Sequence, residues 1–235
     1  MFDRVKQIQL CGLVALMLPL AALTARPAQA AGGAQIVDDS EVVTPGTCQL
    51  ETWVTRFDPG DGYLNLAPAC TMEKLPTLEI GAAFQHYWAE TIGAPLFGPA
   101  IKFNFRPESS GLGVGLAFTG GVNLRSGDLE LASLIVPVTI PLDDRVRVNL
   151  NAGWSYLRDA DYPNAAFYGA QVEAKVGLDV TLMVEAFGRA PGVAGAQIGL
   201  RYRPGDGPID FDLLAGGFFD SVNPRFFTVG VTIRY

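Results

Sequence analysis

The chain ends with Arg225–Tyr235, which reads RFFTVGVTIRY. Every second residue of this stretch is apolar, and the residues between them are mostly Thr, Gly and Arg. Because successive side chains of a β-strand point to opposite faces, the pattern predicts a strand with one apolar face. That face comprises Phe227, Val229, Val231, Ile233 and Tyr235. Chain ends usually fray in water, so a strand that is apolar up to its last residue needs an apolar environment.

The beginning of the chain predicts export. Basic residues precede an apolar run from residue 8 to residue 23, and residues 28–30 (Ala-Gln-Ala) have the small-x-small pattern of a signal-peptidase site. We therefore expect residues 1–30 to be a cleavable signal peptide rather than a membrane helix. Their removal changes the formal charge from −7 to −9, because three basic residues and one acidic residue are lost. Such an acidic chain lacks the positive excess that phosphate binding requires, which argues against a nucleic-acid partner.

Two cysteines, Cys48 and Cys70, remain in the mature chain, in a compartment where disulfides persist. They are separated by two extended stretches around the turn signal of residues 58–62 (Asp-Pro-Gly-Asp-Gly). A hairpin folded at this turn places the two cysteines opposite each other, close enough for a disulfide. Two free thiols are the alternative. Metal binding is disfavoured because no second cysteine pair or neighbouring histidine completes a site, and we expect no cofactor.

The remaining hydrophobicity is distributed on alternate residues. Beyond the leader, no apolar run approaches the roughly 20 residues that a membrane-spanning helix needs. Instead, segments of about ten residues alternate and are separated by turn signals, which is the pattern of a transmembrane β-barrel. A soluble sandwich would carry Lys, Glu and Thr on its second face. Here that face carries Gly, Asn and paired charges, which suits a crowded or watery lumen.

The pattern predicts an all-β fold, a single antiparallel up-and-down barrel of about twelve strands. The candidate strands are 49–57, 63–70, 77–88, 98–106, 111–121, 130–141, 144–157, 166–177, 180–189, 195–203, 208–218 and 225–235. Ten strands remain if 49–70 forms a separate hairpin outside the wall. An even number of strands returns both termini to the periplasmic side, and the connections that face outward are expected to be longer. Residues 31–47 are expected to be a disordered periplasmic lead, and residues 48–235 the barrel.

Two further expectations concern particular residue types. Pro137 cannot donate a hydrogen bond to a neighbouring strand, which predicts a bulge or a weak seam at this position. Aromatic residues gather near the ends of the predicted strands, as expected for rings at the membrane–water interface. Among them are Phe57, Phe167, Phe218 and Phe226.

The leader, the alternating strands and the closing FTVGVTIRY together resemble Gram-negative outer-membrane β-barrel proteins. The resemblance implies that the final strand, with its terminal aromatic residue, is the signal that the barrel-assembly machinery reads, and that outer-membrane lipid surrounds the wall. Within this class, the start CQLETWV…PAC and the compact loops are similar to the outer-membrane transporter family associated with meta-pathway phenol degradation. This chain ends in Tyr, whereas Phe is the commoner final residue of the assembly signal.

Few residues suggest chemistry. His86, the single histidine, shares a face with apolar neighbours and is expected to point toward lipid. The resemblance to outer-membrane barrels includes phospholipases with a lipid-facing His beside a Ser nucleophile, but Ser155 is expected to face the lumen, where the required hydrogen bond could not form. GLGVG at residues 111–115 lies within an alternating strand that no helix follows, so it does not predict a phosphate loop. We expect no catalytic residues, and the glycines are expected to keep the lumen open or let the sheet bend.

The lumen is the remaining place for a function. The charged residues predicted to face inward are Glu79, Lys102, Arg106, Arg145, Arg147, Glu173, Lys175, Glu185, Arg201, Arg203, Asp210, Asp212 and Arg234. They predict either a polar path with a slight basic bias or a salt-bridge network that closes a narrow barrel. The first hypothesis is a passive channel for small polar or anionic solutes. The second is a structural barrel with a closed lumen, and the third is a lipid-active enzyme that uses His86.

Overall fold

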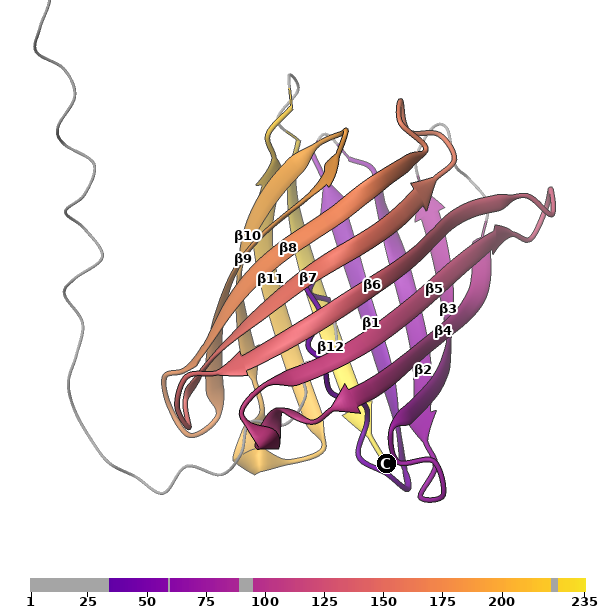
Figure 1. Ribbon diagram of the computed structural model, residues 1–235. Helices are drawn as coiled ribbons and strands as arrows, with labels where there is room; N and C mark the ends of the chain where they lie inside the picture. The colour runs from indigo at the N-terminus through magenta and orange to yellow at the C-terminus, as the bar shows by residue number, and fades with distance from the viewer. Residues whose placement is uncertain (1–33, 59, 89–94, 221–223) are drawn as a thin grey trace, which may run out of the picture.

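A computed structural model describes residues 34–58, 60–88, 95–220 and 224–235, and it shows a closed antiparallel barrel (Figure 1). Twelve strands form the wall, each paired with its neighbours in the sequence. They are β1 (Thr47–Phe57), β2 (Gly62–Thr71), β3 (Leu78–Trp88), β4 (Pro95–Arg106), β5 (Gly113–Asn123), β6 (Leu129–Pro141), β7 (Val146–Leu157), β8 (Asn164–Lys175), β9 (Val180–Ala190), β10 (Ala194–Tyr202), β11 (Ile209–Phe218) and β12 (Arg225–Arg234). The predicted fold class and strand number are confirmed.

The seam that closes the barrel joins β1 to β12. The pairing extends from Gln49 opposite Arg234 to Phe57 opposite Phe226. Beyond it, the backbone N–H and C=O of Tyr235 exchange hydrogen bonds with those of Cys48, at 2.9 and 2.8 Å. Because lipid offers no partner to a backbone group, the last strand must pair with the first. The hairpin of residues 49–70 therefore belongs to the wall, and the ten-strand alternative is wrong.

The predicted disulfide lies beside this seam. Cys48 and Cys70 are directly opposite each other on β1 and β2 and are bonded at an S–S distance of 2.04 Å. The first strand is therefore covalently joined to the second at the end where Tyr235 pairs with it.

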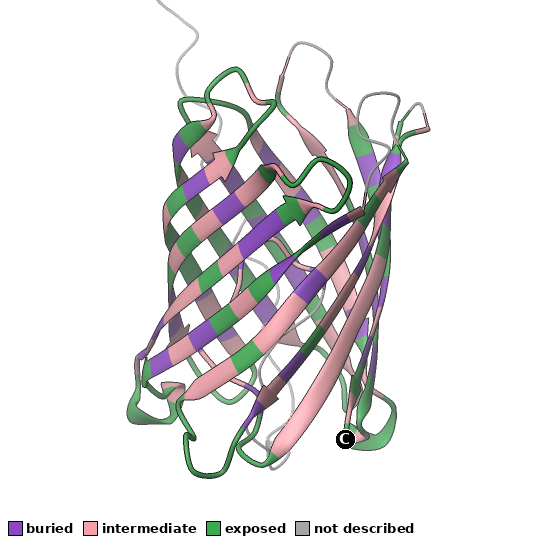
Figure 2. Cartoon of the chain, turned by 90° about the vertical axis from the view of Figure 1, so that its right-hand side faces the viewer, coloured by how far each residue is buried: buried purple, intermediate pink, exposed green. Residues whose placement is uncertain are grey.

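The two faces of the wall differ as the alternation predicts, and Figure 2 shows the resulting stripes of burial along the strands. On β12, Phe227, Val229 and Ile233 are exposed on the outer face, whereas Thr228 and Thr232 are buried. In water such an outer face would be a continuous apolar patch, so it marks the surface that faces lipid. The predicted orientation of the closing strand is confirmed.

The pairing of β5 with β6 is interrupted beside Pro137. Val114 pairs with Val138 and Ala117 with Ile135, but no pair is formed between these two points. The register is the same on both sides of the interruption, and on its other edge Pro137 pairs regularly with Asn151 of β7. The missing N–H therefore produces a weak seam without a bulge, and the bulge of this strand pair lies at Gly121–Val122 instead.

Short connections join the strands at both rims. The C-terminal rim, where Tyr235 lies, carries two 3₁₀ turns, η1 (Glu108–Ser110) and η2 (Pro204–Asp206). The rim at the other end, the distal rim, carries connections of similar length, so the expected difference between the two sets is not found. In the described ranges, no helix has the length and apolar character needed to cross a membrane.

Residues 34–46 enter the barrel instead of lying outside it (Figure 1). We call this stretch the luminal segment. Val37, Asp39 and Ser40 are at most 1% exposed. The expectation of a disordered lead is therefore wrong for this stretch, because its polar groups find partners on the inner wall. Residues 1–33, which include the predicted signal peptide, lie outside the described residues.

Candidate functional site in the barrel lumen

The backbone of the luminal segment is held by side chains of the wall. Its N–H groups donate to carboxylate, amide and hydroxyl oxygens that project inward from β3, β6, β7 and β9. These bonds are Val37 N to Glu185 Oε2 at 2.7 Å, Asp38 N to Asn151 Oδ1 at 2.9 Å, Ser40 N to Thr139 Oγ1 at 2.9 Å and Val43 N to Glu79 Oε2 at 2.8 Å. A segment with no regular secondary structure is thus stabilised in the lumen, because buried N–H groups need partners.

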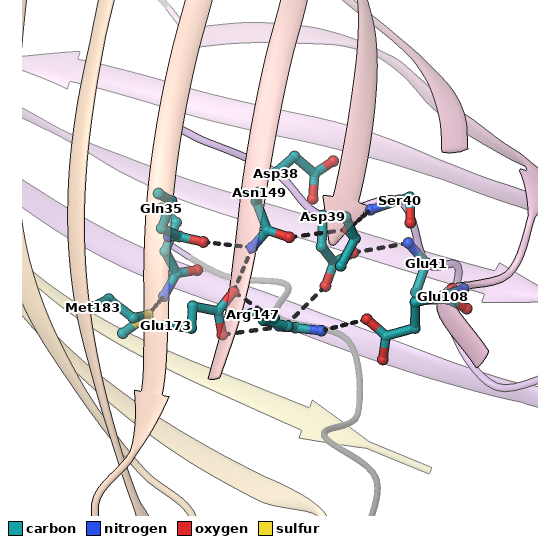
Figure 3. Close-up of polar contacts among 12 residues, drawn as sticks. Gln35, Asp38, Asp39, Ser40, Glu41, Glu108, Arg147, Asn149, Glu173 and Met183 are labelled. Atoms are coloured by element: carbon teal, nitrogen blue, oxygen red, sulfur yellow. Dashed lines mark hydrogen bonds and ion pairs between the residues drawn. The ribbon is translucent and has the colours of Figure 1, made fainter. Parts of the chain in front are cut away.

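Asp39 is the centre of an ion-pair network that joins the luminal segment to β4 and β7, and Figure 3 shows its contacts around Arg147. Its carboxylate lies 3.2 Å from Lys102 Nζ on β4 and 3.2 Å from Arg147 Nη2 on β7. The same guanidinium contacts Glu173 at 3.1 Å and Glu108 of η1 at 3.3 Å. Glu108 lies at the C-terminal rim, where burial raises the pKa of its carboxyl and the Arg147 guanidinium opposes that shift. Buried charges are tolerated here because they are paired.

A second network lies along β10–β12. Arg201 donates to both carboxylate oxygens of Asp212, at 2.7 and 2.9 Å. Asp210 accepts from Arg203 and from Arg234, the latter at 2.7 Å. Arg201 also donates to Gln35 of the luminal segment at 3.1 Å, so the two networks hold the segment from opposite sides.

The structure brings most of the predicted luminal residues into these networks. The charged side chains of both networks, together with Glu79 and Glu185, are buried or partly buried on the inner face. Arg145 and Lys175 lie at the C-terminal rim, where they line a side cavity of about 320 Å³. Arg106 is the exception, because a register shift between Asn104 and Arg106 turns it onto the rim. There it donates to Ser110 Oγ at 2.9 Å.

Sequence reasoning missed several inward residues. Glu51 and Asn65 face the lumen from β1 and β2, and both polar atoms of the Asn65 amide are without a hydrogen bond to the described residues. Gln49, Glu51 and Trp53 are alternate residues of β1, so the polar side chains of the first two could have identified the luminal face of this strand. The carboxylates of the luminal segment gave no signal, because that segment has no period to place them.

Several aromatic rings expected at the membrane interface point into the barrel. They form a chain of contacts near the distal rim, the aromatic arc, with neighbouring ring centres 5.1–6.5 Å apart. The arc consists of Phe187, Phe218, Phe226, Phe57, Tyr63 and Tyr87. Phe187 and Phe226 enclose Val37 of the luminal segment. The interface assignment is wrong for Phe57, Phe167, Phe218 and Phe226, because the position of a ring along a strand does not say which face the ring takes.

Three cavities adjoin one another along the luminal segment. The distal cavity has about 980 Å³, the middle cavity about 300 Å³ and the C-terminal cavity about 410 Å³. Asp38, Gln85 and Thr119 line both the distal and the middle cavity. Glu41 and Gln49 line both the middle and the C-terminal cavity. Open space therefore follows the segment from one rim toward the other.

The residues considered for chemistry do not come together. His86 is exposed on the outer face of β3, whereas Ser155 is buried on the inner face of β7 and accepts from Arg189 Nε at 2.9 Å. The wall therefore separates them. Within the part of the chain that the structure describes, no three His, Cys, Asp or Glu side chains are grouped to hold a metal.

Comparison with solved structures shows a fold shared with outer-membrane β-barrels. The chain is similar to the KdgM porin in complex with disordered oligogalacturonate, with a TM-score of 0.63 and 12% identity over 79% of this chain and 98% of that one. It is also similar to the COG4313 outer membrane channel from Pseudomonas putida F1, with a TM-score of 0.61 and 8% identity over 84% and 98% of the two chains. The outer membrane phospholipase dimer of Salmonella typhi with bound calcium matches with a TM-score of 0.53 and 14% identity over 80% and 91%.

No curated protein sequence matches this chain. The narrower resemblance to phenol-degradation transporters is not confirmed by these matches and remains a prediction. A family model covers residues 19–235, which is most of the chain. The chain therefore belongs to the family described as uncharacterised conserved protein UCP029691.

Proposed function

We propose that this protein is an outer-membrane channel for small polar solutes, and that the luminal segment narrows its lumen. The observation that carries the proposal is the series of adjoining cavities beside the segment. A barrel built only for rigidity could fill this space with side chains, as small barrels do. Here Asn65 presents an amide to the middle cavity without a partner among the described residues, so a passing solute or water could bind it.

We call the row of adjoining cavities the route. The charged groups that line it favour cations over anions. The middle cavity is lined by five carboxyl side chains and one ammonium group: Asp38, Asp39, Glu41, Glu51, Glu79 and Lys102. The basic bias expected from the wall alone is reversed because the luminal segment contributes three of these carboxyl groups. We therefore propose neutral and cationic solutes in place of the anionic solutes that the sequence suggested.

Planar bilayers test this function. The purified barrel should give discrete single-channel currents, and its reversal potential in a KCl gradient should show a preference for K⁺. Glu51→Gln and Glu79→Gln together should reduce that preference, because they remove two of the five carboxyl groups while keeping similar shapes. Asp144→Asn, at the C-terminal rim outside the three cavities, is the control and should leave it unchanged.

The closed structural barrel is the second candidate, and the ion pairs of Asp39 across the lumen favour it. A folded barrel that inserts and gives no current would support this second function and exclude the channel. A preference for Cl⁻ would retain a channel and contradict the route proposed through the middle cavity.

A further inference from the structure

We propose that the distal cavity is a binding site for small organic cations that carry an aromatic or other apolar group. This inference rests on the proposed channel function, since molecules bound there would be positioned to enter the route beside the luminal segment. It is argued from three features of the cavity: its apolar wall, its aromatic rings and its charge.

The wall of the distal cavity is largely apolar. Phe167, Phe187 and Phe218 line it from three different strands, and Ile36 of the luminal segment contributes an apolar side chain. A volume of about 980 Å³ is at the upper end of the range of about 300–1,000 Å³ found for small-molecule sites. An apolar wall of this kind inside a membrane channel is not needed to bind water or inorganic ions, so it indicates an organic solute.

Two rings of the aromatic arc, Phe187 and Phe218, line the distal cavity and add a specific attraction. The faces of aromatic rings carry negative potential, and they attract ammonium groups more strongly where water is excluded. The arc extends from Phe187 of β9 to Tyr87 of β3. Tyr87 donates its hydroxyl to Gln85 Oε1 at 3.1 Å, and Gln85 lines both the distal and the middle cavity.

The charged groups around the cavity favour a cation. Among the described residues, Asp38, Asp159 and Asp161 line it, and Arg189 is the single basic residue that does so. The Arg189 guanidinium already donates to wall groups, among them Ser155 Oγ at 2.9 Å and the Pro163 carbonyl at 2.8 Å. It is therefore less available to a solute anion. Asp38 pairs with Lys102 at 2.9 Å, but 40% of its side chain remains exposed.

Equilibrium binding to the detergent-solubilised barrel tests the site without requiring conduction. Isothermal titration calorimetry would compare benzyltrimethylammonium with benzenesulfonate, which has the ring and the opposite charge, and with tetramethylammonium, which has no ring. We expect benzyltrimethylammonium to bind about tenfold more tightly than either. Equal or tighter binding of benzenesulfonate would overturn the proposal, as would equal binding of tetramethylammonium.

A matched pair of variants on β8 locates the binding. Phe167→Leu removes a ring from the cavity and should weaken binding of benzyltrimethylammonium by about threefold to tenfold. Tyr168→Leu removes a ring from the outer face of the same strand, where Tyr168 is exposed, and should leave the affinity unchanged. Heat-modifiable gel mobility would verify that both variants are folded. Equal effects of the two substitutions would contradict the site.

The binding experiment and the bilayer experiment can fail separately. Binding without any current would support the cavity site while excluding the channel. Cation-selective current without binding would retain the channel and overturn this site.

Discussion

Two glycines on the inner face of β5 leave space for the luminal segment. A Cβ atom on Gly113 would collide with Ser40 Oγ, and one on Gly115 would lie 3.1 Å from the Ser40 carbonyl oxygen. These glycines were expected to keep the lumen open or to let the sheet bend. Instead they make room for the backbone and side chain of Ser40, whose carbonyl accepts from Asn104 at 2.9 Å. At this scale, the absence of a side chain lets the luminal segment lie close against β5.

Two neighbouring residues of β6 test which face of the wall contacts lipid. Leu134 and Ser133 are neighbours on β6, but Leu134 is 43% exposed on the outer face and Ser133 lines the distal cavity. Leu134→Arg should lower the free energy of unfolding in lipid by about 2–4 kcal/mol, because lipid cannot solvate the charge. Ser133→Arg should cost much less, since the cavity has space and nearby carboxyl groups.

Equilibrium unfolding in lipid vesicles, followed by heat-modifiable gel mobility, would measure both variants. Equal costs at the two positions would mean that the alternation does not mark a lipid boundary. Wild-type protein in the same vesicles is the reference.

At the scale of an element, two different kinds of force hold the luminal segment. Val37 is enclosed by Phe187 and Phe226, whereas Asp39 is held by ion pairs. Burial of a valine side chain contributes about 1.5–3 kcal/mol, so the apolar contact is a substantial part of the attachment. The wall itself is complete without the segment, because every strand pairs with two neighbours.

Loosening the segment should therefore widen the channel without unfolding the barrel. Val37→Asp places a charge among aromatic rings, and we expect it to raise single-channel conductance several-fold. Val42→Asp is the matched control for the added charge: Val42 is only half-buried beside the C-terminal cavity, so the segment should stay in place and conductance should not rise several-fold. Currents in planar bilayers would measure both. Unchanged conductance in Val37→Asp, with the barrel folded, would show that the segment does not limit conduction.

At the scale of the whole molecule, the even number of strands puts both ends of the wall at one rim. Both ends of the barrel wall lie at the C-terminal rim, since Cys48 pairs with Tyr235 there. We expect this rim to face the periplasm, as is usual for bacterial barrels with an even strand number. The loop lengths do not decide the matter, because both rims carry short connections.

Labelling in cells would determine the orientation. Ser126→Cys lies in a distal connection and Ser109→Cys in η1 at the C-terminal rim, and both positions are exposed. A membrane-impermeant maleimide should label Ser126→Cys in intact cells and Ser109→Cys only after lysis. The native disulfide leaves no other free thiol among the described residues. The reverse pattern would invert the proposed orientation.

The barrel itself could be predicted from the sequence because its signal is local. Alternation along each strand reports the apolar outer face, and lipid permits only a closed set of strands. The turn at residues 58–62 placed Cys48 opposite Cys70 for the same reason, since a hairpin is a short-range structure. The role of Tyr235 in assembly remains a prediction that folding geometry does not test.

The contents of the lumen were decided only by the tertiary structure. The luminal segment has no periodicity, and its partners are distant in the chain: Glu79 is 36 residues from Val43, and Glu185 is 148 residues from Val37. Phe226 was assigned to the interface from its position near a strand end, although the alternation of β12 puts it on the face opposite to Phe227. Glu51 was missed although it lies within the predicted strand 49–57. The charge of the route, and with it the proposed solute class, depends on carboxylates that a non-periodic segment brings inside. A local pattern determines a wall, whereas what the wall encloses depends on long-range contacts between side chains.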